Sequence, residues 1–316
     1  MISGDGMDNG PERTRILRLE PDSFRPLGPE CTLVTIGQPL EPAELEQVAI
    51  LVQGRPEVTL RFHTRAARDL EFLRYFPGLQ RLSVDLWELA DIGGFAHLRG
   101  GLELLHFGKT RKRFSLRFLQ TMPALRALSL VGHTKDIASL SGLGGLTSLA
   151  LRGITLPDLS AVASLPQLET FSLLLGGTTQ LDHLAMLPKL QTLSLMQVAR
   201  LADLSILARL RALKTLDLDS LRNVTALPSL TALARLENVT LETMKGLTDL
   251  SPIAAAPALR RLTIAGMPQL SAEAFGCLVG HPSLTELHLW SSLGGVNLKK
   301  PVLQAVRELL PAVVRP

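Results

Sequence analysis

Aromatic residues are scarce in this sequence. They make up 4% of the 316 residues, whereas the hydrophobic share as a whole is 46% and is dominated by leucine. A core with so few rings is filled by one aliphatic side chain used repeatedly, which favours a regular interior. No glycine- or serine-rich stretch divides the chain, although it is too long for a typical single core. A repeat architecture fits both observations, because it grows by adding turns.

Cysteine, excess charge and long apolar runs are also lacking. Cys31 and Cys277 lie at opposite ends of the chain without metal-ligand spacing, so we expect structural or free thiols rather than a disulfide. A net charge of +4 is small for this length, so nucleic acid is not expected as a partner. Apolar runs stop well short of the ~20 residues that span a bilayer, and the N-terminal residues lack the apolar region of a secretory signal. We expect a cytoplasmic monomer without a membrane segment.

Motifs for catalysis, cofactors and metals are missing as well. The tripeptide Gly108–Thr110 is similar to the end of a phosphate-binding loop, but position 103 is Glu where that motif needs Gly. The basic run from Lys109 to Arg113 has no interleaved stacking aromatics and indicates a solvated loop. The histidines lack metal-binding spacing, and no nucleophile elbow occurs. We therefore expect no enzyme, no cofactor and no metal, and we expect Trp87 to be a packing residue.

One spacing, L-x-x-L-x-L, recurs with conservative replacements along most of the chain. Successive copies start 21 to 25 residues apart. Two degraded copies precede them, at Cys31 and Arg55, so that twelve turns fit the sequence. The ten clear copies start at Leu79, Leu102, Leu125, Leu146, Leu168, Leu190, Leu213, Leu236, Leu259 and Leu284.

Each copy predicts a short strand followed by a helical return. The fourth and sixth positions are apolar and the fifth is not, which is the alternation of a strand with one buried face. The second half of each turn carries another apolar set, as in DLSILARL, where Asp or Ser can cap a single helical turn. Stacked turns would form a parallel sheet on the concave side, with wider helical or 3-10 segments on the convex side.

The repeat resembles the leucine-rich-repeat superfamily, and its short turns with a D-[LI]-S-like second half look most like the class of internalins and of a regulatory subunit of protein phosphatase. The resemblance covers Cys31 to Leu289 and implies an α/β solenoid, a right-handed superhelix or horseshoe with a concave parallel sheet. One departure is that the usual Asn at the ninth position is absent. We therefore expect irregular turns there, with backbone groups bonded in another way or hydrated. That position holds Trp87, Thr110, His133, Ile154, Gly176, Val198, Leu221, Met244, Met267 and Ser292.

The ends of the chain predict caps. We expect a disordered tail over 1–12, a cap with the first degenerate turns over 13–54, the solenoid over 55–297 and a capping helix over 298–316. Within these regions we predict an edge strand from Arg13 and helices from Glu41 and Lys300. Longer helices are also predicted from Thr64 and Ser271.

Outward strand positions suggest where a partner binds. The third, fifth and seventh positions of each copy face away from the core, and their character changes along the chain. An apolar centre flanked by charge is typical of a protein-binding hot spot. The alternative is that the apolar residues only pack on each other and the charges are solvated. The predicted partner-binding residues are basic Arg61, Arg81 and Arg152, apolar Val131, Leu174 and Met196, acidic Asp217, Asp219 and Glu242, and outward-facing Trp290.

We interpret the chain as a non-catalytic scaffold that binds an unidentified protein or peptide on the concave face. Two other functions stay open: a recognition subunit of an enzyme complex, and a ligand-sensing module. A scaffold of repeats separates fold from function, so the sequence does not name the partner.

Overall fold

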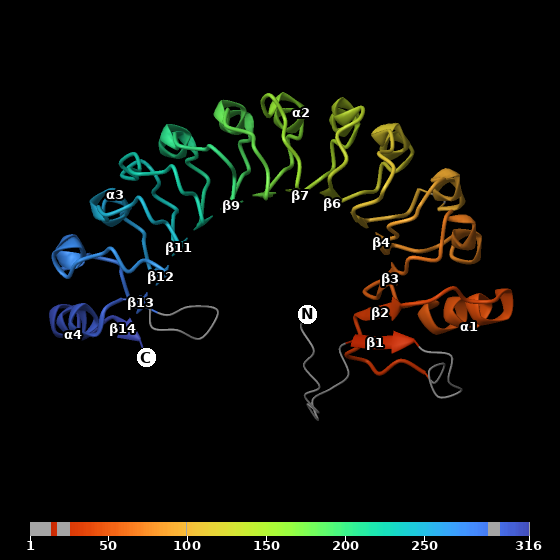
Figure 1. Cartoon of the computed structure of the whole chain (residues 1–316), viewed down its shortest axis with the longest axis horizontal. Helices are drawn as coiled ribbons and strands as arrows, with labels where there is room; N and C mark the ends of the chain where they lie inside the picture. Colours follow the sequence, from red (N-terminus) through yellow and green to blue (C-terminus); the bar gives the residue numbers. More distant parts are fainter. Residues whose placement is uncertain (1–13, 18–25, 99, 290–297, 316) are drawn as a thin grey trace. The chain divides into compact units, whose positions relative to one another are not determined.

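The computed structural model describes residues 14–17, 26–98, 100–289 and 298–315. The chain divides into two compact units, which we treat separately. The first comprises residues 1–114 and 121–128, and the second comprises residues 115–120 and 129–316. In each unit the strands form one face, here called the strand face, and the helical segments form the other (Figure 1).

The first unit contains five parallel strands among its described residues, paired in chain order. One α-helix and two 3-10 helices return the chain between them. The elements are β1 (Thr14–Leu17), β2 (Leu33–Ile36), α1 (Pro42–Val52), β3 (Thr59–His63), η2 (Glu71–Tyr75), β4 (Arg81–Asp85), η3 (Gly93–His97) and β5 (Leu104–Phe107). Two further elements, η4 (Leu116–Thr121) and β6 (Ala127–Val131), have residues assigned to both units.

The second unit continues the same pattern, and its strands from β7 to β14 also pair in parallel and in chain order. The elements are η5 (Ile137–Gly142), β7 (Ser148–Arg152), α2 (Ser160–Ala163), β8 (Thr170–Leu174), η6 (Asp182–Met186), β9 (Thr192–Met196), η7 (Ser205–Arg209), β10 (Thr215–Asp219), β11 (Asn238–Glu242), α3 (Ser251–Ala254), β12 (Arg261–Ala265), η8 (Glu273–Leu278), β13 (Glu286–His288), α4 (Lys300–Leu309) and β14 (Val314–Arg315).

The predicted alternation is confirmed, and each of the twelve turns has its strand. In β8, for example, Phe171 and Leu173 are buried, whereas their neighbours on either side are only half-buried. The core of each turn is this pair of side chains together with the apolar residues of the helical segment, such as Leu184 in η6. The fold is an α/β leucine-rich-repeat solenoid.

The register of the second turn differs from the prediction. Leu60 pairs with Val34 and with Leu82, so Leu60 and Phe62 hold the fourth and sixth positions that the sequence assigned to Val58 and Leu60. A slip of two residues keeps every side chain on its own face, because the strand period is two. The slip moves Arg61 from the seventh position to the fifth.

The predicted irregular turns at the ninth position are wrong for the second unit, where the turns are regular. The residue at the eighth position adopts a left-handed conformation, and its N–H donates to the seventh-position carbonyl of the next turn. Leu175 donates to Met196 at 2.9 Å, and Ser220 donates to Glu242 at 2.8 Å. The ninth position is buried and apolar instead, as at Leu221 and Met244. A backbone ladder thus replaces the missing asparagines.

Three helical segments of the second unit, α2, η7 and α3, begin next to an aspartate whose carboxylate accepts the N–H of the serine two residues further on. The Asp203 carboxylate accepts the N–H of Ser205 at 2.7 Å, and Asp249 accepts that of Ser251 at 2.8 Å. These hydrogen bonds from Ser205 and Ser251 lower the pKa of both carboxyl groups.

Two of the four predicted helices are confirmed and two are wrong. The segments expected from Glu41 and Lys300 are α1 and α4. From Thr64 the helix is only η2, because the Arg68 carbonyl accepts N–H groups of Ala90 and Asp91 on the next turn. From Ser271 it is only η8, whose bonds join residues three apart.

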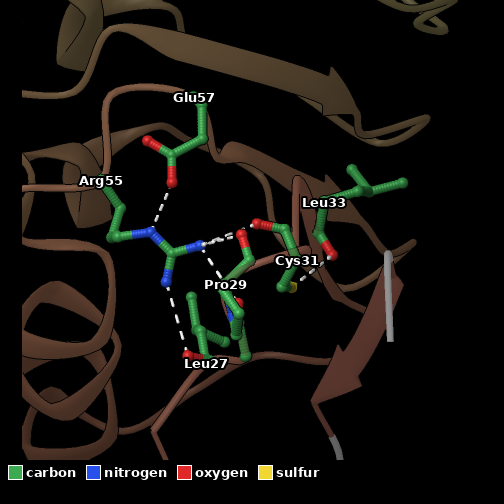
Figure 2. Close-up of polar contacts among 7 residues, drawn as sticks. Leu27, Pro29, Cys31, Leu33, Arg55 and Glu57 are labelled. Carbon is green, nitrogen blue, oxygen red and sulfur yellow. Dashed lines mark hydrogen bonds and ion pairs between the residues drawn. The ribbon is translucent and has the colours of Figure 1, made fainter. Parts of the chain in front are cut away.

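Arg55 holds the start of the first unit together (Figure 2). Its guanidinium donates to the carbonyls of Gly28 at 3.2 Å and Cys31 at 3.1 Å, and it pairs with Glu57. Cys31 is buried and Cys277 is exposed, and both are free thiols as predicted.

Candidate functional site

A row of outward side chains crosses the strand face of the second unit. Each residue holds the seventh position of its turn and is the register partner of the next. Val131 holds that position on β6, whose next residue, Gly132, donates its N–H to the carbonyl of Arg152 at 2.9 Å. The structure therefore brings together most of the predicted residues of this unit. From β7 to β12 the row is Arg152, Leu174, Met196, Asp219, Glu242 and Ala265.

Two apolar side chains of this row, Leu174 and Met196, lie near a third at the eighth position, Leu175, and we call the three the Leu174 patch. Leu174 and Met196 are half-buried cross-strand neighbours, and Leu175 is 42% exposed. Near the patch, the two rows beside it carry small side chains. The small residues are Thr170, Thr192 and Thr215 in one row and Ala150, Ser172 and Ser194 in the other.

Leu175 is in an unfavourable state in two respects. Its φ is 55°, a left-handed conformation that costs a non-glycine residue about 1–2 kcal/mol. Its apolar side chain also faces water. The left-handed conformation is shared by Gln197, Ser220 and Thr243 at the same position of later turns, so the exposed apolar side chain is what sets Leu175 apart.

Charged groups follow the patch along the chain. Burial raises the pKa of the Asp217 carboxyl, and a hydrogen bond from Thr240 opposes that shift. Further on, Arg261 donates to Glu286 at 2.6 Å and His288 contacts the same oxygen at 3.1 Å, and these partners lower the pKa of Glu286 to about 2. The later half of the face is thus mixed in charge rather than purely acidic.

The strand face of the first unit is organised around Asp85. Its carboxylate accepts from Arg61 at 3.0 and 3.2 Å and lies 3.3 Å from Nε2 of His106. His63 lies 3.9 Å away. The hydrogen bond with His106 is the largest cause that lowers the pKa of Asp85, against the desolvation that raises it. We call Arg61, His63, Asp85 and His106 the Asp85 cluster.

The Asp85 carboxylate packs directly against Gly108. A Cβ atom at Gly108 would lie 2.0 Å from Oδ1 of Asp85 and 2.8 Å from the carbonyl oxygen of Val84. Only glycine therefore fits beneath the cluster. Hollows of about 710 and 830 Å³ lie on the two sides of Asp85.

The remaining predicted residues are apart from these clusters or outside the described part. Arg81 lies on β4 of the first unit, where Nε is 3.4 Å from the Thr59 hydroxyl. Trp290 lies outside the described residues. His63, Trp87 and Lys109 were not among the predicted partner-binding residues. Trp87 is 41% exposed, and the Lys109 ammonium lies 5.6 Å from the centroid of its ring. A tryptophan at the ninth position, which holds small or aliphatic residues in most other turns, was the available signal.

Neither a metal-binding group nor a membrane-spanning helix is found among the described residues. No group of three or more His, Cys, Asp or Glu side chains is arranged to hold a metal ion. None of the helices there combines the length and the apolar character required to span a membrane.

Comparison with known proteins supports the fold. No family profile and no curated protein matches the chain. Among solved structures, an internalin (InlF) of Listeria monocytogenes is 20% identical with a TM-score of 0.58, covering 89% of this chain and 79% of its own. A leucine-rich-repeat protein of Leptospira interrogans is 16% identical with a TM-score of 0.52, covering 97% and 96%. A chain of the Drosophila Toll–Spätzle complex is 13% identical with a TM-score of 0.58, covering 94% of this chain and 45% of its own.

These likenesses and the twelve stacked strands define the chain as a leucine-rich-repeat solenoid. Within that class it is similar to an internalin over most of both chains. Solenoids of this kind present long, continuous surfaces suited to interaction with other macromolecules.

Proposed function

We propose that this chain is a non-catalytic interaction scaffold that binds a protein or peptide through the strand face of its second unit. The observation that carries the proposal is the Leu174 patch. Three apolar side chains stand together among small residues, with Arg152 on one side and Asp217, Asp219 and Glu242 on the other. An apolar centre with a charged rim is the usual anatomy of a protein-binding site.

The cost of Leu175 supports this proposal. The left-handed backbone of Leu175 serves the ladder, since its N–H donates to Met196, but the exposed part of its side chain leaves water only when a partner covers it. Leu174 and Met196 are cross-strand neighbours, and Leu175 beside them is still 42% exposed. A partner such as Spätzle, with which Toll was solved, illustrates that a protein of this fold forms protein complexes.

The test is capture of partners by the full chain from native lysate, with mass spectrometry as the readout. Leu174→Asp combined with Met196→Asp places two charges in the apolar centre at positions that are not fully buried. We expect the captured proteins to be lost while circular dichroism and melting stay close to the wild type.

A matched control is Met186→Asp with Val279→Asp. Both residues are exposed apolar residues of the second unit, 64% and 53% exposed, and lie outside its strands. This variant should retain every captured protein. Equal capture by the patch variant and the control would refute the assignment of the partner site.

If the captured proteins include an enzyme, the scaffold would act as the recognition subunit of an enzyme complex. We further propose that the scaffold acts as a monomer in the cytoplasm and that residues 13–54 and 298–316 cap its two ends. Size-exclusion chromatography with light scattering tests the monomer, and deletion of residues 298–316 with a melting curve tests the C-terminal cap.

A further inference from the structure

One flank of the first unit is basic, where the chain leaves the strands towards the helical segments. A hollow of about 830 Å³ there is lined by Arg65 and Lys109 among others. A second hollow, of about 390 Å³, is lined by Arg68, Arg111 and Lys112. Glu88 lines both hollows, so they adjoin. We call these residues, together with Trp87, the Trp87 flank.

Trp87 is the apolar centre of this flank. The ninth position is fully buried in turns such as that of Leu221, whereas Trp87 is 41% exposed and lines the larger hollow. Lys109, from the following turn, lies 5.6 Å from the indole centroid. Trp87 is thus only partly packed, and its exposed ring gives the basic run that begins at Lys109 an aromatic neighbour from the preceding turn.

The charges of the flank do not cancel. Five cations line the two hollows against two carboxylates, Asp85 and Glu88. Asp85 is held by Arg61 and His106, and Glu88 lies 3.6 Å from Arg111. Arg65 and Arg68 have no ion-pair partner among the residues that the structure describes. An exposed aromatic amid uncompensated positive charge fits an anionic partner with one apolar contact.

We propose that the Trp87 flank binds an acidic segment of a partner protein, one that carries an apolar or aromatic side chain to pack on the indole. Surfaces that hold single-stranded nucleic acid use successive aromatic platforms along a positive groove. The flank offers a single indole, and two carboxylates lie among its cations. An acidic peptide needs one anchor and a few separate cations, which is what the flank provides.

This surface is separate from the Leu174 patch, because every residue of it belongs to the first unit. The proposal is therefore independent of the one for the strand face. A variant of the patch is expected to leave binding at the flank unchanged, and a variant of the flank should leave capture through the patch unchanged.

The probe is a fluorescein-labelled peptide EEDFEED, measured by fluorescence polarisation with the full chain. Its counterparts are the same peptide with Phe replaced by Ala and a 12-residue oligouridine. We expect EEDFEED to bind and to weaken as salt rises, since exposed charge contacts are screened. We expect the Ala peptide to bind more weakly than EEDFEED, by about tenfold, because an aromatic anchor is lost.

Arg65→Glu with Lys109→Glu reverses two exposed charges beside the indole. We expect the affinity for EEDFEED to fall by about tenfold or more. The matched control is Arg222→Glu with Lys245→Glu, an exposed Arg and Lys of the second unit, and it should bind as the wild type does. Trp87→Ala should abolish the difference between the Phe and Ala peptides.

Three results would overturn the proposal. One is that the wild type does not bind EEDFEED at low salt. Another is that the reversal at Arg65 and Lys109 weakens binding no more than the control. The third is that oligouridine binds more tightly than EEDFEED and loses its affinity in the same variant, which would assign the flank to nucleic acid.

Discussion

The two units build their strand faces from the same positions but treat polar groups differently. In the first unit Arg61, Asp85 and His106 bind one another, so the face satisfies its own charges. In the second unit the fifth-position residues from β7 to β9 are the small Ala150, Ser172 and Ser194, and the Leu174 patch lies beside them. Charges bind one another again only further along this unit, where Arg261 and His288 contact Glu286. A face whose side chains bind each other is stabilised from within, whereas a face with exposed apolar residues gains most when a partner covers it.

The comparison extends to backbone conformation. The first unit uses Gly108 to admit the Asp85 carboxylate at a distance that no Cβ atom allows. The second unit instead places Leu175 at a left-handed position where Gly132 and Gly153 occupy the equivalent turns. In the first unit, glycine at position 108 lets the Asp85 carboxylate pack closely. In the second unit, leucine instead of glycine at position 175 places an apolar side chain on the surface.

The largest expected effect is at Gly108. Gly108→Ala would place Cβ against the Asp85 carboxylate and the Val84 carbonyl, and overpacking of this kind costs about 2–3 kcal/mol. Urea denaturation at pH 7 measures it. Gly78→Ala is the control, since nothing lies within 4 Å of its Cβ and its φ is not left-handed. Equal denaturation midpoints for the two variants would show that the Asp85 cluster is not tightly packed.

The next effect compares two aspartates of the seventh position. Asp85→Ala leaves Arg61 and His106 without their shared acceptor and should cost about 1–2 kcal/mol, because its carboxylate is largely buried. Asp219→Ala removes only a bond from the adjacent Ser220 hydroxyl, and surface changes of this kind stay within about 0.5 kcal/mol. Denaturation of both variants in parallel measures the difference. A cost at Asp219 equal to that at Asp85 would contradict the distinction between the faces.

The pH dependence of stability should have opposite signs for Asp85 and Asp217. The pKa of Asp85 is lowered by His106 and Arg61, so its contribution to stability is present at neutral pH and is lost as pH falls below the ordinary aspartate range. The pKa of Asp217 is raised by burial, so its contribution is full at low pH and is lost as pH rises through the folded-state pKa.

The corresponding variants are Asp85→Asn and Asp217→Asn, each followed by denaturation between about pH 3 and pH 7, the range in which aspartates titrate. Asp85→Asn should lose stability mainly at neutral pH, which flattens the acid side of the curve. Asp217→Asn should gain stability relative to wild type as pH rises. The same sign for both variants would mean that one of the two environments has been misread.

The repeat predicted the fold because two independent periodicities agreed. Strand alternation and the return of leucine every 21 to 25 residues both follow from the need to bury two side chains in each turn. The register of the second turn was not predicted correctly. A shift of two residues preserves the alternation, so the sequence could not distinguish Val58 and Leu60 from Leu60 and Phe62 as its core pair.

The same reasoning explains which site residues were predictable. Leu174 and Met196 hold the same position in successive strands, so a correct repeat makes them neighbours. Trp87 and Lys109 lie in segments that follow the strands. No alternation of apolar and polar residues continues there, so the sequence does not predict which way their side chains point. The short helix found after Thr64 has a similar cause, because the Arg68 carbonyl accepts N–H groups of the next turn and not of its own segment.

The smallest expected effect is at Leu175, and it separates folding from binding. Leu175→Gly removes the left-handed penalty of about 1–2 kcal/mol but adds chain entropy that glycine loses on folding, about 0.5–1 kcal/mol, so we expect a net gain of about 0.5 kcal/mol. The same change deletes the most exposed side chain of the Leu174 patch, so partner capture should weaken. Thr243→Gly, at the equivalent position two strands beyond Met196, should stabilise the fold by a similar amount without touching capture. A Leu175→Gly protein that is more stable and still captures its partners fully would show that the leucine does not serve binding.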